Sequence, residues 1–102
     1  MTSRPHSALD RFDRWTARDL PLHIYRHDEE WVCFQARSGD THLFDLLPGT
    51  LLELLREGAF SSGELARELR ARFDFEEGFD LAEYIDEVLW KFEQHALIRP
   101  VT

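Results

Sequence analysis

The sequence predicts an α+β fold of the winged-helix-like kind, in which a three-stranded antiparallel sheet is followed by a three-helix bundle. Residues 21–45 are rich in aromatic and β-branched side chains and are divided by short polar turns, which is typical of strands. After Asp45 the apolar residues change to helical spacing. A chain of 102 residues has the size of one domain. We expect a single domain over residues 21–102, preceded by a partly flexible arm over residues 1–20.

The arm is mostly polar, with Phe12 and Trp15 as its candidate anchors. Chain termini are commonly poorly ordered unless they are tied to the fold. We expect the first residues to be flexible and the rest of the arm to fold back onto the domain.

The expected sheet is an antiparallel meander. Its turns are short, and short turns join strands in antiparallel order. Gly39 in the second turn can adopt the positive φ that a tight turn requires. The expected strands are Leu22–His27, Trp31–Gln35 and Thr41–Asp45.

The second of these strands has apolar side chains on both faces. Val32 and Phe34 share one face and Trp31 and Cys33 share the other, because side chains alternate along a strand. The helices can cover one face. The other face requires cover from residues 9–15, from a second subunit or from a partner.

Three helices are expected after the sheet. Asp45 is a candidate N-cap for the first helix, and Gly58 marks its end. A Ser-x-x-Glu pattern at Ser61 has the spacing of a capping box and opens the second helix. An Asp-x-x-Glu pattern at Asp80 opens the third, which is expected to run to about Ala96.

The third helix is amphipathic. At ~100° per residue, its apolar side chains fall within one arc, whereas Trp90 lies on the opposite, acidic side. Three explanations for Trp90 stay open: cover by Phe12 and Trp15, burial in a homodimer, or exposure for a partner protein. The apolar arc consists of Leu81, Ile85, Val88, Leu89, Phe92 and Ala96.

The chain is acidic, with a formal net charge of −8. Proteins bind phosphate backbones largely through Lys and Arg, so this charge argues against nucleic acid and anionic membranes as partners. It favours a basic or amphipathic partner segment. The sequence contains no signal-peptide pattern and no apolar stretch long enough to cross a bilayer. With Cys33 as the only cysteine, a cytoplasmic setting is expected.

No pattern in the sequence indicates catalysis. His23 and His27 are the closest pair of histidines, but on a strand they would be ~13 Å apart. Ser61 and Ser62 fit helix caps, since neither lies in a Gly-x-Ser-x-Gly elbow. Cys33 is expected to be a small buried side chain without special reactivity. We therefore expect a protein that is not an enzyme and has no catalytic residues, no metal site and no cofactor.

Several short motifs together resemble the PqqD-like proteins, and more narrowly the subgroup encoded near HPr-kinase-related proteins. The resemblance extends over about residues 15–99, with the long charged loop Asp74–Asp80 as a departure from the family pattern. The motifs are a Trp-containing arm, Trp31-Val32, Ser38–Asp45, Leu52–Leu55 and Glu64–Ala66.

This resemblance implies a non-catalytic peptide chaperone, or RiPP recognition element. Such domains capture the leader segment of a ribosomally synthesised precursor peptide and present it to a peptide-maturation enzyme. The leader adds as a strand beside the third strand and lies against the third helix. Carried over by position, the peptide-binding residues would be Thr41, His42, Leu43, Phe44 and Asp45 on the strand, and Tyr84, Ile85, Val88 and Leu89 on the helix.

Two alternatives come from the residues themselves. In a homodimeric protein-interaction domain, the apolar sheet face would be a subunit interface. In an acidic winged-helix transcription factor, the third helix would read DNA, but it carries a single Lys91 among many carboxylates. DNA binding is therefore the weaker alternative. The carboxylates are Asp80, Glu83, Asp86, Glu87 and Glu93.

Overall fold

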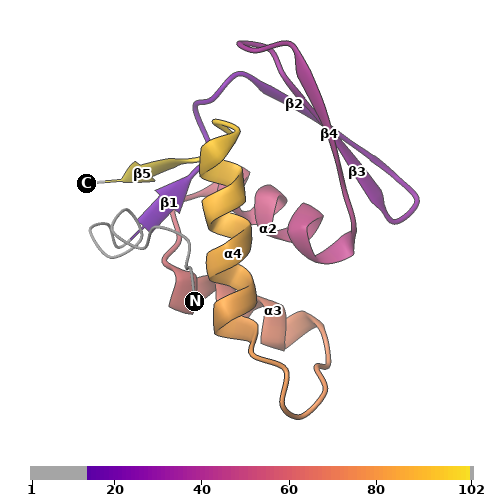
Figure 1. Ribbon diagram of the computed structural model, residues 1–102, viewed down its shortest axis with the longest axis vertical. Coiled ribbons are helices and arrows are strands. Elements are labelled where there is room, and N and C mark those ends of the chain that lie inside the picture. Colours follow the sequence, from indigo (N-terminus) through magenta and orange to yellow (C-terminus); the bar gives the residue numbers. More distant parts are fainter. Residues whose placement is uncertain (1–13, 102) are drawn as a thin grey trace, which may run out of the picture.

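The computed structural model describes residues 14–101, which form two antiparallel sheets and three helices (Figure 1). One sheet pairs β1 with β5, and the other has the strand order β2-β3-β4. The predicted α+β fold, with a three-stranded antiparallel sheet followed by three helices, is confirmed. The elements are β1 (Arg14–Thr16), β2 (Leu22–His27), β3 (Glu30–Gln35), β4 (Asp40–Phe44), α2 (Leu46–Glu57), α3 (Ser62–Arg72), α4 (Leu81–Gln94) and β5 (Arg99–Val101).

The strands of the three-stranded sheet match the expected ranges to within one residue at each end. Gly39 has a φ of +80° in the turn before β4, which confirms its predicted role. Trp31 and Cys33 of β3 are buried in the interior, while Phe34 on the opposite face is exposed. The helices therefore cover only one face of this sheet. Burial raises the pKa of the Cys33 thiol, as expected for a side chain without special reactivity.

The predicted helix boundaries follow local hydrogen bonds. Ser61 and Glu64 form a complete capping box, in which each side chain accepts from the other residue's backbone N–H. The Asp80 side chain accepts from the backbone N–H of Glu83 at 3.1 Å. The third helix ends earlier than expected, because Ala96 takes a left-handed φ of 57°. Ala96 is consequently exposed and does not belong to the buried face of α4.

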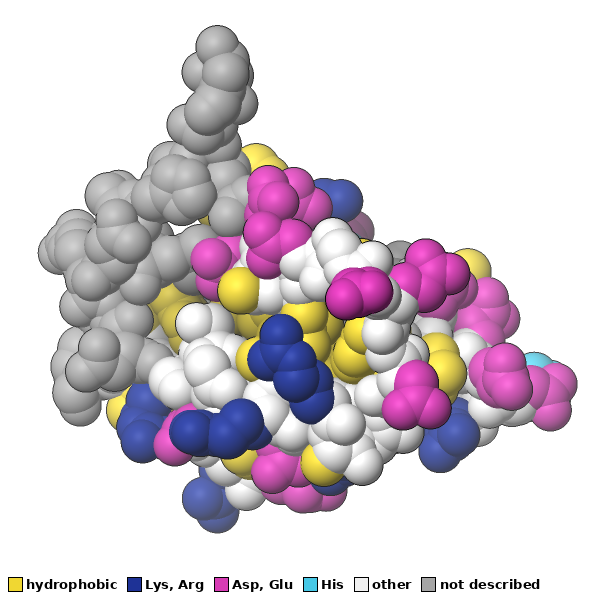
Figure 2. Space-filling view, turned by 90° about the horizontal axis from the view of Figure 1, so that it is seen from below, with side chains coloured by type: hydrophobic (Ala, Val, Ile, Leu, Met, Phe, Trp, Pro, Cys, Tyr) yellow, Lys and Arg dark blue, Asp and Glu magenta, His cyan; other side chains and the backbone are white. Residues whose placement is uncertain are grey.

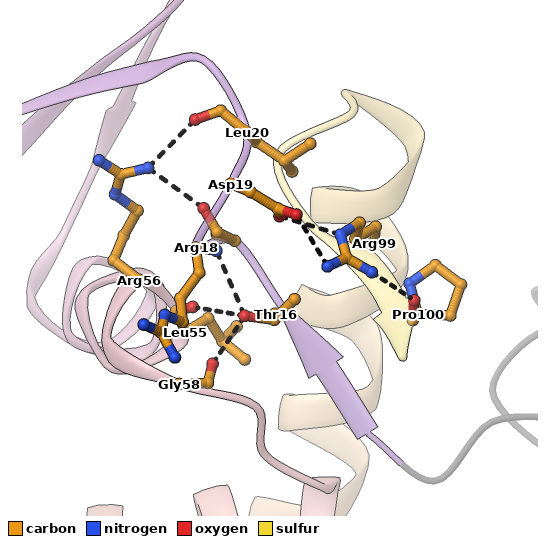
Figure 3. Close-up of polar contacts among 10 residues, drawn as sticks. Thr16, Arg18, Asp19, Leu20, Leu55, Arg56, Gly58, Arg99 and Pro100 are labelled. Atoms are coloured by element: carbon orange, nitrogen blue, oxygen red, sulfur yellow. Dashed lines mark hydrogen bonds and ion pairs between the residues drawn. The ribbon is translucent and has the colours of Figure 1, made fainter. Parts of the chain in front are cut away.

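Residues 14–20 are tied into the fold by polar contacts that the sequence did not predict (Figure 3). The Thr16 hydroxyl donates to the carbonyl oxygens that end α2, including that of Gly58 at 2.8 Å. The Arg56 guanidinium donates to the carbonyl oxygens of Ala17 and Leu20. These contacts hold the chain between β1 and β2 against the end of α2.

A second connection joins this segment to the C-terminal strand. The Arg99 guanidinium forms a two-pronged ion pair with the Asp19 carboxylate, at 2.9 and 3.0 Å (Figure 3). The hydrogen bond from Arg99 lowers the pKa of Asp19. Together with the β1–β5 ladder, this ion pair joins the beginning of the described chain to its end.

The middle of the described part of the arm, Trp15 to Ala17, is buried. Trp15 is 2% exposed, and its N–H and carbonyl pair with Phe60. Phe12, the other expected anchor, lies outside the described residues. Trp90 is half-buried, and the three explanations offered for it stay open. Within residues 14–101, no helix is long and apolar enough to cross a membrane.

Candidate functional site

The outer edge of β4 has no neighbouring strand among residues 14–101. β4 pairs only with β3, with Phe44 opposite Trp31 and Thr41 opposite Phe34. The two segments that could have covered this edge are engaged elsewhere, because β1 and β5 form their own sheet. Every second residue of an edge strand directs its N–H and C=O groups outward, so β4 offers unpaired main-chain groups.

The side chains of β4 alternate between α4 and the outer side of the sheet. Phe44 lies edge-on to Phe92 of α4, with ring centroids 5.3 Å apart. His42 lies next to His95, at the end of α4, with centroids 4.8 Å apart. Leu43 points to the other side of the sheet and is exposed. Only every second residue of the predicted strand site therefore faces α4.

A hollow of about 280 Å³ lies between β4, the start of α2 and α4. We call it the β4–α4 groove. Its walls are mostly apolar and aromatic, with one carboxylate and one ammonium group at the rim. Burial raises the pKa of Tyr84 in this wall, and the nearby Asp45 carboxylate raises it further. The lining residues are Phe44, Pro48, Tyr84, Glu87, Val88, Lys91 and Phe92.

Two of the predicted helix contacts need correction. The side chains of Ile85 and Leu89 are fully buried in the core, so they offer no surface to a bound peptide. Their role is to hold α4 in place. Tyr84 and Val88 line the groove and remain candidates.

The sequence reasoning missed Pro48, Glu87 and Lys91 in the groove wall. Tyr84, Glu87, Val88 and Lys91 recur at steps of three and four, which places them in one stripe along α4. This spacing was a usable signal. The family resemblance gives the helix contacts by position and does not indicate which face of α4 borders β4.

Asp45 occupies the predicted N-cap position of α2, but its side chain makes no capping hydrogen bond. The Asp45 carbonyl accepts from the N–H of Gly49 at 2.9 Å, which is the first intrahelical hydrogen bond of α2. The Asp45 carboxylate is exposed, and its negative charge contributes to the raised pKa of Tyr84.

The loop between α3 and α4 packs aromatic rings against Tyr84 of the groove wall. Phe79 packs on Tyr84, with centroids 5.8 Å apart, and stacks on Phe75 at 5.5 Å. The charged loop that departs from the family pattern thus supports the end of the groove at which α4 begins.

His42 has an unusual environment for an imidazole. Its Nε2 atom is buried and has no hydrogen-bond partner within residues 14–101. Burial lowers the pKa of His42, the neighbouring His95 lowers it further, and Asp40 opposes the shift. The fold therefore favours the neutral form of this side chain.

This shift predicts a pH dependence of stability. Below the ordinary His pKa of about 6.5, the unfolded chain takes up a proton at His42 more readily than the folded chain, so folding stability falls. We expect His42→Phe to lose less stability than the wild type between about pH 7.5 and about pH 5.5. Urea unfolding of both proteins at the two pH values measures this. Equal losses would contradict the assignment to His42.

Carboxylates outnumber basic side chains on α4. Figure 2 views the molecule from the side of α3 and the α3–α4 loop, where acidic side chains surround a small group of basic ones. α4 has Lys91 as its one basic residue. Among the described residues, no group of three His, Cys, Asp or Glu side chains is arranged to hold a metal ion.

Comparisons with known proteins give one structural match of note. No protein-family model and no curated protein matches this sequence. The fold is similar to that of TbiB1, solved in complex with the TbiA(beta) leader peptide. The TM-score is 0.71 at 16% sequence identity, and the alignment covers 85% of this chain and 98% of TbiB1. At this level of identity the match shows a shared fold.

Proposed function

We propose that this protein binds an extended peptide as an additional strand beside β4, and that the peptide is the leader segment of a ribosomally synthesised precursor. The observation that carries the proposal is the open edge of β4 beside the β4–α4 groove. Such an edge offers main-chain hydrogen bonds, and a neighbouring pocket adds selectivity for side chains. The leader peptide bound to TbiB1 supports this class of ligand.

Main-chain hydrogen bonds between the peptide and β4 must be supplemented by side-chain contacts in the groove. Each hydrogen bond contributes only about 0.5–1.5 kcal/mol, whereas micromolar binding requires about 8 kcal/mol. A large apolar side chain adds about 1.5–3 kcal/mol when it is fully buried. We therefore expect the peptide to place at least one such side chain between Phe44, Tyr84 and Val88.

The acidic surface favours a basic or amphipathic leader. The chain has a net charge of −8, Glu87 lines the groove, and the Asp45 carboxylate acts on Tyr84 in the groove wall. Opposite charge speeds the encounter of two chains, and salt screens it. Added salt is expected to lower the association rate constant of a basic leader, and to change its dissociation rate constant less.

We further propose that the protein itself is not a catalyst and presents the bound leader to a peptide-maturation enzyme. A strand added at a sheet edge is held along its length, while the chain beyond it stays free. The part of the precursor that follows the leader would thus remain accessible to a second protein.

NMR titration of ¹⁵N-labelled protein tests the proposal. The ligands are synthetic leader segments of precursor peptides encoded beside it, with scrambled peptides of equal composition as controls. We expect shifts and slower amide exchange in β4, together with shifts in the α4 stripe around Tyr84 and Val88. Absence of binding up to about 1 mM, or binding that leaves β4 unchanged, would falsify the proposal.

A further inference from the structure

The face of the three-stranded sheet that points away from the helices forms a second candidate surface. In the register of the sheet, Tyr25, Val32 and Leu43 lie in one row across the strands. We call this side the outer sheet face. The residues that alternation places on it are His23, Tyr25, His27, Glu30, Val32, Phe34, Thr41 and Leu43.

Exposed apolar side chains gather on this face. Within residues 14–101 only four large hydrophobic residues are exposed, and three of them are here: Tyr25 at 63%, Leu43 at 63% and Phe34 at 37%. The fourth, Phe79, belongs to the α3–α4 loop. Single exposed apolar residues are ordinary, but a contiguous group marks an interaction site.

The charges on this face identify the kind of partner. Although the protein has 20 Asp and Glu residues, Glu30 is the only carboxylate at an outer-face position, and no Lys or Arg is there. A strongly basic or strongly acidic partner would find few groups to pair with. The best complement is another nearly uncharged apolar surface. A second copy of the same face supplies one, and it keeps the acidic remainder of both chains outside the contact.

We propose that two copies of this chain associate outer sheet face to outer sheet face, as a two-fold symmetric dimer. Packing of two sheets at about 10 Å would bury both rows of side chains between them. The contact uses a face of the sheet, whereas peptide binding would use the edge of β4. The proposal therefore does not rest on the proposed peptide function, although Thr41 and Leu43 of β4 belong to the outer sheet face as well.

The size of the face predicts a weak dimer. Three strands spaced ~4.8 Å apart and about five residues long cover roughly 250 Å². A stable interface commonly buries about 800 Å² on each partner. The dimer should therefore form and dissociate with protein concentration.

Sedimentation velocity from about 10 µM to about 1 mM tests this, because a weak dimer grows by mass action. We expect the wild type to shift from monomer to dimer over this range. Tyr25→Glu and Leu43→Glu are each expected to weaken the dimer at least about tenfold, since they bury a charge in the contact. Phe79→Glu is the matched control, because it changes the one exposed large apolar residue of the described chain that lies outside this face, and it should dimerise like the wild type.

A mixing experiment identifies the partner surface. Tyr25→Glu is combined with Tyr25→Lys or with Leu43→Lys, and at least one mixture should regain dimer through opposite charges across the contact. Circular dichroism confirms that each variant is folded. A wild type that stays monomeric at every concentration, a Tyr25→Glu variant that dimerises normally, or no recovery in either mixture would each overturn the proposal.

Discussion

Gly49→Ala is expected to destabilise the protein, although alanine is usually the better helix residue. A Cβ atom at position 49 would fall 2.6 Å from the Cγ of Trp31, far inside normal contact distance. Trp31 cannot move away easily, because it is 1% exposed and its indole N–H donates to the Glu53 carboxylate. Overpacking of this kind costs about 1–3 kcal/mol, which exceeds the gain of up to about 1 kcal/mol in helix propensity. Urea unfolding of the variant and the wild type measures the difference.

Gly63→Ala is the matched control for this prediction. Gly63 also lies in the first turn of a helix, but a Cβ atom there would meet only the Ser61 hydroxyl, at 3.9 Å. We expect this variant to be as stable as the wild type or slightly more stable. If both alanine variants change the free energy of unfolding in the same direction, the result contradicts the prediction that Gly49 is required by the close packing of Trp31.

The secondary structure was predictable because its signals are local. The Ser61 capping box connects residues three apart, and Gly39 needs only its own φ to make a turn. The start of the first helix after Asp45 followed from a change in apolar spacing. Such signals do not depend on which distant segments meet in the fold.

Contacts between distant segments were not predictable from the same evidence. The three-residue strands β1 and β5 pair across almost the whole chain, and strands this short show no alternation to read. Gln35 is another example, because it is 1% exposed and donates to the Ala96 carbonyl at 2.6 Å. A polar residue at the end of a strand carries no sign that the turn after α4 will cover it.

The candidate site shows the same division. The family resemblance pointed to the strand and the helix that border the groove, because it implies a leader beside the third strand and against the third helix. It did not indicate which face of α4 borders β4, so Ile85 and Leu89 were assigned to contact although they are buried. That choice depends on the angle at which α4 packs on the sheet, which is a property of the assembled core.

Tyr84→Ala is expected to weaken leader-peptide binding by at least about tenfold, which corresponds to about 1.4 kcal/mol. Tyr84 forms part of the wall of the β4–α4 groove, together with Pro48 and Val88, and its ring packs on Phe79. Removal of the ring opens the groove and deprives an apolar side chain of the peptide of a contact surface. Tyr84→Phe keeps the ring and should retain most of the affinity. Calorimetric titration with the leader peptide measures all three proteins.

Tyr25→Ala is the internal control, because this chain has only two tyrosines and they lie at different surfaces. Tyr25 is on the outer sheet face, on the strand of the sheet farthest from the β4 edge. Its removal should leave peptide affinity unchanged and weaken self-association, whereas Tyr84→Ala should do the reverse. Equal effects of the two variants on peptide affinity would show that the peptide does not use the groove. Because peptide affinity and self-association are measured separately, the proposals for the peptide site and for the dimer surface can be contradicted independently.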